Sequence, residues 1–327
     1  YLTLTQSSTM NLTNSTAKVE NLIFKDFTNG NFTNKITLND SSKFEVKEIL
    51  SFDKSTFDLD TLKTRNNITL PMAYNLYVFN DSNITATTFT NTKENAQFIV
   101  QNSSFTADKI TFEKNAFMTL DNGKLTLTNG LETQGLNLNL SNSSTLNAKT
   151  LTSTGVSTIN LNDKATLTLE NALTSKNLSV NASNQSKFTA NTLTASGVVN
   201  LNADTNSNIQ FSTLNLQNGN LQNISQNVAI EKLNLTQSTA NLQNLNTNSL
   251  KSIDLKNSSN LHFNELNLND FDKNGLNLTS DDSSKAYIKR LIYDASNARA
   301  NSTNTALQSN IVISEKFELK NVGHNLG

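Results

Sequence analysis

The sequence predicts an all-β chain that folds as a right-handed parallel β-helix, a solenoid whose coils each contain about 21 residues. Paired apolar positions recur at this spacing, a second set of pairs follows the first by 13 positions, and short polar turns separate the two. The first set comprises Leu125/Leu127, Leu146/Ala148, Leu167/Leu169, Phe188/Ala190 and Ile209/Phe211. A fixed period of this size is typical of solenoids, in which no repeat buries its apolar face without its neighbours.

The first strand of each coil reads apolar-x-apolar-x-x-apolar. Such segments start at residues 84, 105, 125, 146, 167, 188, 209, 228 and 248, which lie 19 to 21 residues apart. Alternation with a period of two indicates extended strands with one buried face, because helices repeat every 3.6 residues. The regular repeats cover about residues 84–270.

The second strand of each coil begins 13 positions after the first. Its apolar pairs are Leu138/Leu140, Ile159/Leu161, Val180/Ala182 and Leu201/Ala203. The turns that follow are rich in Asn, Asp and Ser, which bond the nearby backbone and tolerate left-handed conformations. Stacked Asn side chains have two interpretations, amide ladders that reinforce the register or solvated turn residues. Gly155 and Gly197 fall in the other connection, where we expect positive φ angles.

We expect a single β-helical domain over residues 1–327, interrupted by irregular coils at about 63–80 and 281–310. The first interruption contains Pro71, the only proline, and the second contains enough helix formers for a short excursion. Insertions in solenoids often lie on one face and carry contacts. We therefore predict Tyr74, Tyr77, Tyr287 and Tyr293 as candidate partner contacts, because aromatic side chains provide large interface area. Packing against the solenoid or capping one of its ends is the other interpretation of these four residues.

The composition restricts the function classes. Hydrophobic residues make up 35% of the chain, which is low for a globular domain but suits a thin solenoid with a narrow interior. The regular phase of the apolar residues argues against disorder. With 26 basic and 27 acidic residues and no basic stripe, the chain lacks the charge pattern of a nucleic-acid binder. The absence of Cys excludes disulfides and thiolate sites.

The repeated phrase occurs as SSFTADKITF at 103–112, SSTLNAKTLTS at 143–153 and QSKFTANTLTA at 185–195. It resembles the repeats in passenger domains of bacterial autotransporters, and most closely the vacuolating-cytotoxin-like autotransporters of Helicobacter and related bacteria. The resemblance covers most of residues 84–270.

The resemblance implies a β-helical passenger that is exported through the outer membrane, acts at the bacterial surface or after secretion, and contacts host cells as an adhesin, colonisation factor or toxin-like protein. We expect the chain to be a piece of a longer protein whose signal and translocator lie outside it. The expected partners are a host-cell surface receptor or glycan, or another copy of the chain. No apolar run approaches the roughly 20 residues of a membrane-spanning helix.

Two alternatives stay open. A β-helical carbohydrate-active enzyme needs clustered carboxylates on an exposed face. The acidic residues here are scattered: Asp163 and Glu170 fall in turns or on the exterior, and alternation points His262 outward between Leu261 and Phe263. We therefore assign no catalytic residue and no cofactor. A leucine-rich-repeat binding protein is suggested by LNLQNGNL at 214–221, but that family lacks a phased second strand.

One segment approximates a twelve-position calcium loop. Asp270, Asp272 and Asn274 alternate, Gly275 follows, and Asp281 occupies the last ligand position. The last ligand is Asp instead of Glu, and no flanking helix pair is evident, so an ordinary turn between strands is the other interpretation. We assign no metal ligand on this pattern.

One asparagine has the spacing of a bacterial glycosylation site. Asp81 precedes Asn83 by two positions, and Thr85 follows Asn83 by two. Chance matches are expected in a chain so rich in Asn, Ser and Thr. Glycosylation of Asn83 therefore stays a hypothesis.

Overall fold

The computed structural model contains strands and turns, and no α-helix among the residues that it describes. The described residues are 2–5, 9–13, 16–25, 35–39, 43–53, 56–58, 68–69, 76–80, 83–91, 94–245, 249–268, 276–294, 307–308 and 310–320. Within them, no helix is present that is long and apolar enough to cross a membrane. The structure confirms the all-β class and the parallel β-helix.

The chain divides into two compact units, which are described separately. The first comprises residues 1–174 and 183–188. Its strands are β1 (Leu2–Thr5), β2 (Thr9–Thr13), β3 (Thr16–Lys25), β4 (Lys35–Asn39), β5 (Lys43–Asp53), β6 (Thr56–Asp58), β7 (Ile68–Thr69), β8 (Leu76–Asn80), β9 (Asn83–Asn91), β10 (Ala96–Gln101), β11 (Ser104–Asp121), β12 (Lys124–Ser141), β13 (Thr145–Ser153), β14 (Val156–Leu161) and β15 (Thr166–Ser175).

The second unit comprises residues 175–182 and 189–327. Its strands are β16 (Asn177–Ala182), β17 (Lys187–Ala195), β18 (Val198–Ala203), β19 (Asn208–Gln217), β20 (Asn220–Ile224), β21 (Val228–Thr236), β22 (Thr239–Asn241), β23 (Ser252–Lys256), β24 (Asn260–Leu268), β25 (Asn277–Ser280), β26 (Lys285–Asp294), β27 (Leu307–Gln308) and β28 (Ile311–Lys320). The first two residues of β17 belong to the first unit, and Ser175, the last residue of β15, belongs to the second.

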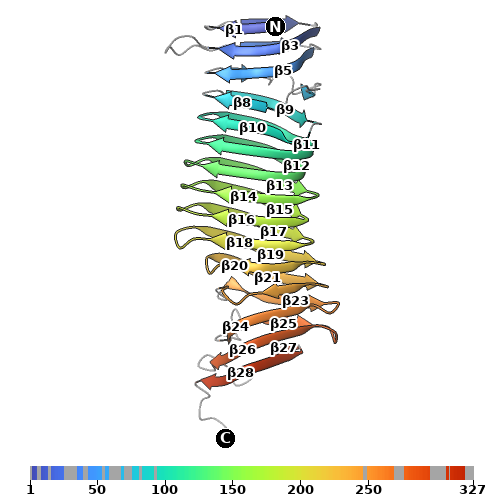
Figure 1. The fold of residues 1–327 in the computed structure, drawn as a ribbon, viewed down its shortest axis with the longest axis vertical. Helices are drawn as coiled ribbons and strands as arrows, with labels where there is room; N and C mark the ends of the chain where they lie inside the picture. Colours follow the sequence, from blue (N-terminus) through green and yellow to red (C-terminus); the bar gives the residue numbers. More distant parts are fainter. Residues whose placement is uncertain are drawn as a thin grey trace. The chain divides into compact units, whose positions relative to one another are not determined.

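Within each unit, a strand pairs in parallel with the strand one coil before it (Figure 1). In the first unit, Leu125 of β12 pairs with Leu146 of β13, which pairs with Leu167 of β15. These partners are 21 residues apart, so the sequence repeat is the coil length. Equivalent apolar side chains therefore stack in continuous interior rows.

The predicted division into two strands per coil is confirmed by β13 and β14, which begin at Thr145 and Val156. In β14 the burial pattern alternates strictly, with Ser157, Ile159 and Leu161 buried. In the two preceding coils the connection is itself extended, so β11 and β12 are each continuous over 18 residues. The register shifts within the β11–β12 pairing mark where these long strands bend.

A cluster of four phenylalanines fills the interior of the first unit. Phe89, Phe98, Phe105 and Phe112 are at most 2% exposed. Their ring centroids lie 5.1 to 6.2 Å apart, mostly in edge-to-face geometry. Such pairs contribute about 0.5–1.5 kcal/mol each beyond area burial. The same inward position that elsewhere holds leucine therefore accommodates aromatic rings when neighbouring coils supply them together.

The prediction of positive φ at Gly155 and Gly197 is wrong, because no described glycine adopts it. The left-handed residues are mainly asparagines and their neighbours, such as Asn142 (φ 53°) and Ser143 (φ 61°). The Ser144 N–H donates to the Ser141 carbonyl at 3.1 Å across these two residues. Two consecutive positive φ values are the signature of a type I′ turn, in which Asn is favoured.

Asparagine amides bond between coils in the turns, where one of the two sequence interpretations placed them, as in Asn184 and Asn162, and they also form ladders on strand faces, where the sequence did not predict them. Each Nδ2 donates to an Oδ1 one coil earlier, in the pairs Asn160–Asn139 (2.8 Å), Asn202–Asn181 (3.1 Å) and Asn234–Asn215 (2.7 Å). Each pair also occupies matching register positions on outward strand faces. The ladders therefore reinforce register on the solvent side, as stacked apolar rows do inside.

Parts of the two segments predicted as irregular are regular strands. Within 63–80, Leu76–Asn80 forms β8, which pairs in parallel with β10. Within 281–310, Lys285–Asp294 forms β26, which pairs with β24 and β28. Most of the other residues in these segments, 63–67, 70–75, 295–306 and 309, lie outside the described part of the chain. For those residues the irregular coils stay a prediction.

We expect Phe211→Ala to lower the free energy of unfolding by about 3–5 kcal/mol, because truncation leaves a cavity in the core. Phe211 is 0% exposed. Urea unfolding of the purified chain measures the effect. The adjacent exposed residue supplies the control: Gln210→Ala is expected to change stability by less than about 0.5 kcal/mol. Equal losses from the two variants would contradict the assignment of inward and outward faces.

Candidate binding surfaces on the second unit

A ladder of buried serines builds one corner of the second unit. The hydroxyl of Ser238 accepts the Gly219 N–H at 3.1 Å, Ser259 accepts the Ser238 N–H at 3.1 Å, and Ser284 accepts the Ser259 N–H at 3.0 Å. All three serines are at most 4% exposed. Each therefore satisfies a backbone donor of the preceding coil, which would be costly to bury unpaired.

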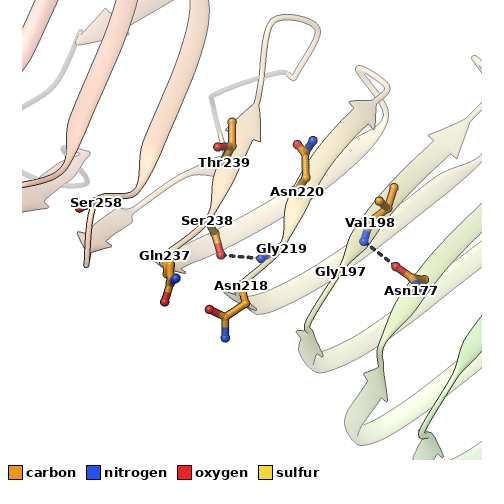
Figure 2. A pocket seen from close by; sticks show the side chains of 10 residues that line it. All are labelled: Asn177, Gly197, Val198, Asn218, Gly219, Asn220, Gln237, Ser238, Thr239 and Ser258. Atoms are coloured by element: carbon orange, nitrogen blue, oxygen red, sulfur yellow. Dashed lines mark hydrogen bonds between the residues drawn. The ribbon is translucent and has the colours of Figure 1, made fainter.

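A groove of about 440 Å³ lies outside this corner, where the first strand of each coil turns into the second. We call it the corner groove. Its lining includes Asn177, Gly197, Asn218, Gly219, Gln237 and Ser258 (Figure 2). Figure 2 shows the Asn177 Oδ1 accepting the Val198 N–H, at 2.8 Å, and the Ser238 hydroxyl accepting the Gly219 N–H. The floor of the groove is thus fixed by hydrogen bonds between coils.

The two glycines of the corner groove are required by the close approach of coils. A Cβ at Gly197 would lie 2.3 Å from the Asn177 Oδ1 and 2.6 Å from the Lys176 carbonyl oxygen. A Cβ at Gly219 would lie 2.7 Å from the Gly197 carbonyl oxygen. Glycine therefore brings the two backbones together and leaves the groove floor without side chains.

A second cavity lies at the ends of β18, β20 and β22. It has a volume of about 510 Å³, and six of its lining residues are Asn or Gln. We call it the amide cleft. Among the described residues, none that lines either cavity has an ionisable side chain. Glycoside cleavage uses a pair of carboxyl groups, and the described lining of the two cavities provides none.

His262 and Tyr287 form a stacked pair on the outer face of the same unit. Their ring centroids lie 4.9 Å apart with an interplanar angle of 8°. The two residues pair in register on β24 and β26, and both are half-buried. Burial of Leu261 and Phe263 confirms that His262 points outward. Of the four tyrosines predicted as contacts, Tyr287 therefore lies on a surface available to a partner.

The other three tyrosines cannot be placed as contacts in the same way. Tyr74 lies outside the described residues. Tyr77 pairs in register with Phe98, and Tyr293 pairs with Leu268 and Leu319, so both belong to regular strands. Their role as partner contacts stays a prediction.

Of the four side chains in the candidate calcium loop that were considered as ligands, the structure describes Asp281 alone, because residues 269–275 lie outside the described part. One carboxylate oxygen of Asp281 accepts the Asn257 N–H at 2.6 Å, and the other accepts the N–H and hydroxyl of Ser283 at 3.1 and 2.9 Å. The bonds from Ser283 close the turn that contains Asp281, and the bond from Asn257 joins this turn to the preceding coil. Among the described residues, no group of three His, Cys, Asp or Glu side chains is placed to hold a metal ion.

The hydrogen bonds to Asp281 change its acidity. The Asn257 N–H, and then the hydroxyls of Ser284 and Ser283, lower the pKa of Asp281 from 3.8 to about 2. Each donor stabilises the ionised carboxylate more than the neutral acid. This perturbed group has a structural cause in the turn and so does not indicate a catalytic acid.

The remaining candidates from the sequence occupy turns, strands or the exterior. Asp163 and Lys164 are the left-handed residues of one turn, with φ angles of 53° and 64°. Glu170 is exposed on β15. Asn83 begins β9 and pairs with Ser104 and Thr56, and its glycosylation stays a prediction. The second histidine, His324, lies outside the described residues.

Sequence reasoning did not find the corner groove or the amide cleft. The relevant residues were visible as polar turns, but which turns lie side by side depends on the coil-to-coil register. One signal was available for the corner: Gly219, Ser238 and Ser259 recur at 19- and 21-residue spacing. Small residues at a repeated position indicate a tight corner in a solenoid.

Comparison of the chain with protein-family models, with curated proteins and with solved structures gave no match.

We expect Asp281→Asn to destabilise the protein at neutral pH, with a difference from the unaltered chain that shrinks as the pH falls from 3.8 towards 2. The folded pKa lies below the unfolded value, so the ionised carboxylate stabilises the fold above the unfolded pKa and this contribution is lost on acidification. Unfolding free energies measured across this range test it. The exposed neighbour provides the control variant Asp282→Asn. A difference that does not depend on pH would contradict the role of the charge.

Proposed function

We propose that the chain is a non-enzymatic passenger domain of an autotransporter-like bacterial protein, displayed at the cell surface or secreted, and that its solenoid exterior contacts host cells. The observation that carries this proposal is that the two faces of each strand hold different kinds of side chain. Inward positions hold stacked apolar side chains, whereas the outward ladders and the amide cleft are made largely of uncharged amide and hydroxyl groups. Such an exterior offers many hydrogen-bond donors and acceptors on a fixed frame.

The rigidity of this exterior supports a binding role. Amides in the ladders are held by bonds of 2.7 to 3.1 Å between coils, and the Gly219–Ser238 bond fixes the groove floor. A surface that is ordered before binding loses less side-chain entropy when a partner arrives. The stacked pair of His262 and Tyr287 adds an aromatic contact of the kind enriched at the centres of interfaces.

The two alternatives have less support. An enzyme would place its acid and base groups in a cavity, and the described residues that line the corner groove and the amide cleft include no such group. In the regular coils of the first unit, β12 pairs with both β13 and β14, so each coil contributes two parallel ladders. Each unit of a leucine-rich repeat would contribute one such strand ladder.

We expect the purified chain to bind cultured host epithelial cells saturably, and Tyr287→Ala to weaken this binding about fivefold or more, because loss of an interface anchor typically costs over 1 kcal/mol. Flow cytometry with fluorescently labelled protein measures both. Tyr287→Phe keeps the ring stacked on His262 and serves as the control. The absence of saturable binding by the unaltered chain would overturn the proposed function, whereas equal binding by the two variants would remove Tyr287 from the contact surface.

A further inference from the structure

The amide cleft lies where the second strands of successive coils become shorter. β18 has six residues, β20 has five and β22 has three. After β22 the chain turns, and the Leu245 N–H donates to the Leu242 carbonyl at 3.2 Å. This shortening leaves a recess of about 510 Å³, which is within the size range of ligand sites.

A β-bulge directs an additional side chain into this recess. Val199 of β18 pairs with Leu221 of β20, but the next residue, Asn200, pairs with Asn223. Gln222 is therefore the extra residue, and both Gln222 and Asn223 are exposed on a strand that otherwise alternates. Bulges are common beside functional sites because they redirect side chains without ending the strand.

The six amides of the cleft fall into two groups. Asn202 donates to Asn181 at 3.1 Å, Asn223 donates to Asn200 at 2.7 Å, and the Asn241 Oδ1 accepts the Gln243 N–H at 3.2 Å. The side chains of Gln222, Gln243 and Asn244 make no hydrogen bond with any described residue, and all three residues are exposed. Three amides are thus fixed by the fold and three are available to a ligand.

We propose that the amide cleft binds a neutral oligosaccharide. A free amide offers two N–H donors and a carbonyl acceptor, which matches sugar hydroxyls that both donate and accept. The described residues that line the cleft carry no charge, so phosphate, sulfate and carboxylate groups gain no ion pair from them. Neighbouring second strands are about 4.8 Å apart, a spacing similar to the length of a sugar ring. This inference names a ligand class for the proposed host-contact function and rests on it for its biological setting.

A peptide is a poorer occupant of the cleft. Addition of a peptide strand requires an open sheet edge. Here β20 is paired with β18 and β22, and β22 is also paired with β24, so both edges of these two strands are occupied. Seven of the eight lining residues are polar and the eighth, Ile224, is 4% exposed, which leaves no apolar pocket for a side-chain anchor.

The outward row of the cleft continues towards the aromatic pair. Asn241 pairs in register with His262, which is stacked on Tyr287. An oligosaccharide longer than the cleft would extend along this row. We therefore expect longer neutral chains to bind more tightly than their short counterparts, and Tyr287→Ala to reduce this gain with length.

The test uses the full chain on an array of short neutral oligosaccharides of glucose, galactose, mannose and N-acetylhexosamines, with sialylated and sulfated counterparts and a peptide library alongside. The cleft variant combines Gln222→Ala, Gln243→Ala and Asn244→Ala. The control variant combines Asn208→Ala, Gln210→Ala and Gln217→Ala, which removes the same number of exposed Asn and Gln amides from β19. Urea unfolding verifies that both variants fold.

We expect the unaltered chain and the control variant to bind the same neutral oligosaccharide, and the cleft variant to bind it at least about tenfold more weakly, since three hydrogen-bonding groups are lost. Equal binding by both variants, no binding to neutral sugars, or preferential binding to charged sugars or peptides would overturn the proposal.

Measurements of cell binding distinguish failure of the cleft proposal from failure of the proposed host-contact function. If the unaltered chain binds cells but no neutral sugar, the cleft proposal fails and the host-contact function stands. If the unaltered chain binds neutral sugars but no cells, the host-contact function fails and the cleft stands.

Discussion

The described coils depend on in-register parallel pairing with the coils before and after them. A coil with one strand of about nine residues and another of about six, such as β13 with β14, has too little apolar surface to form a core by itself. Stacking converts isolated apolar positions into continuous rows, such as Leu125, Leu146 and Leu167. The same pairing satisfies backbone donors and acceptors along each strand. The sequence repeat therefore keeps the same strand register from one coil to the next.

The serine, glycine and asparagine positions follow from this constraint. At the corner of the second unit, coils approach closely enough that Gly197 and Gly219 have no room for a Cβ, while the Ser238 hydroxyl replaces a backbone acceptor. On the outer faces, asparagine amides bond to the equivalent amide one coil away. A composition that resembles disorder is thus explained by repeated polar contacts between coils. The amide cleft lies where this repetition is broken by the bulge at Gln222.

The candidate sites were only partly predictable. Alternation was enough to place His262 on the exterior. Tyr287 was predictable as a contact because it is an aromatic residue in a segment whose sequence departs from the repeat. Their stacking required knowledge that β24 and β26 pair with a 25-residue offset, which departs from the 21-residue period. The acidic spacing around Asp281 suggested a metal ligand, but its carboxylate is used as a hydrogen-bond acceptor by Asn257 and Ser283. Spacing along the chain does not reveal which donors from another coil reach a carboxylate.

The sequence by itself determined the strand period, the two-strand coil, the inward residues and the parallel β-helix. It could do so because apolar alternation and the repeat period can be read from short stretches of sequence. The same pattern recurs in many coils, so each occurrence supports the same strand assignment. The tertiary structure decided where positive φ falls, why Gly155 and Gly197 are glycines, and which amides are paired or free. These outcomes depend on distances of a few ångströms between residues about twenty positions apart. Such distances are set by how one coil lies on the next, and a repeat pattern does not specify them.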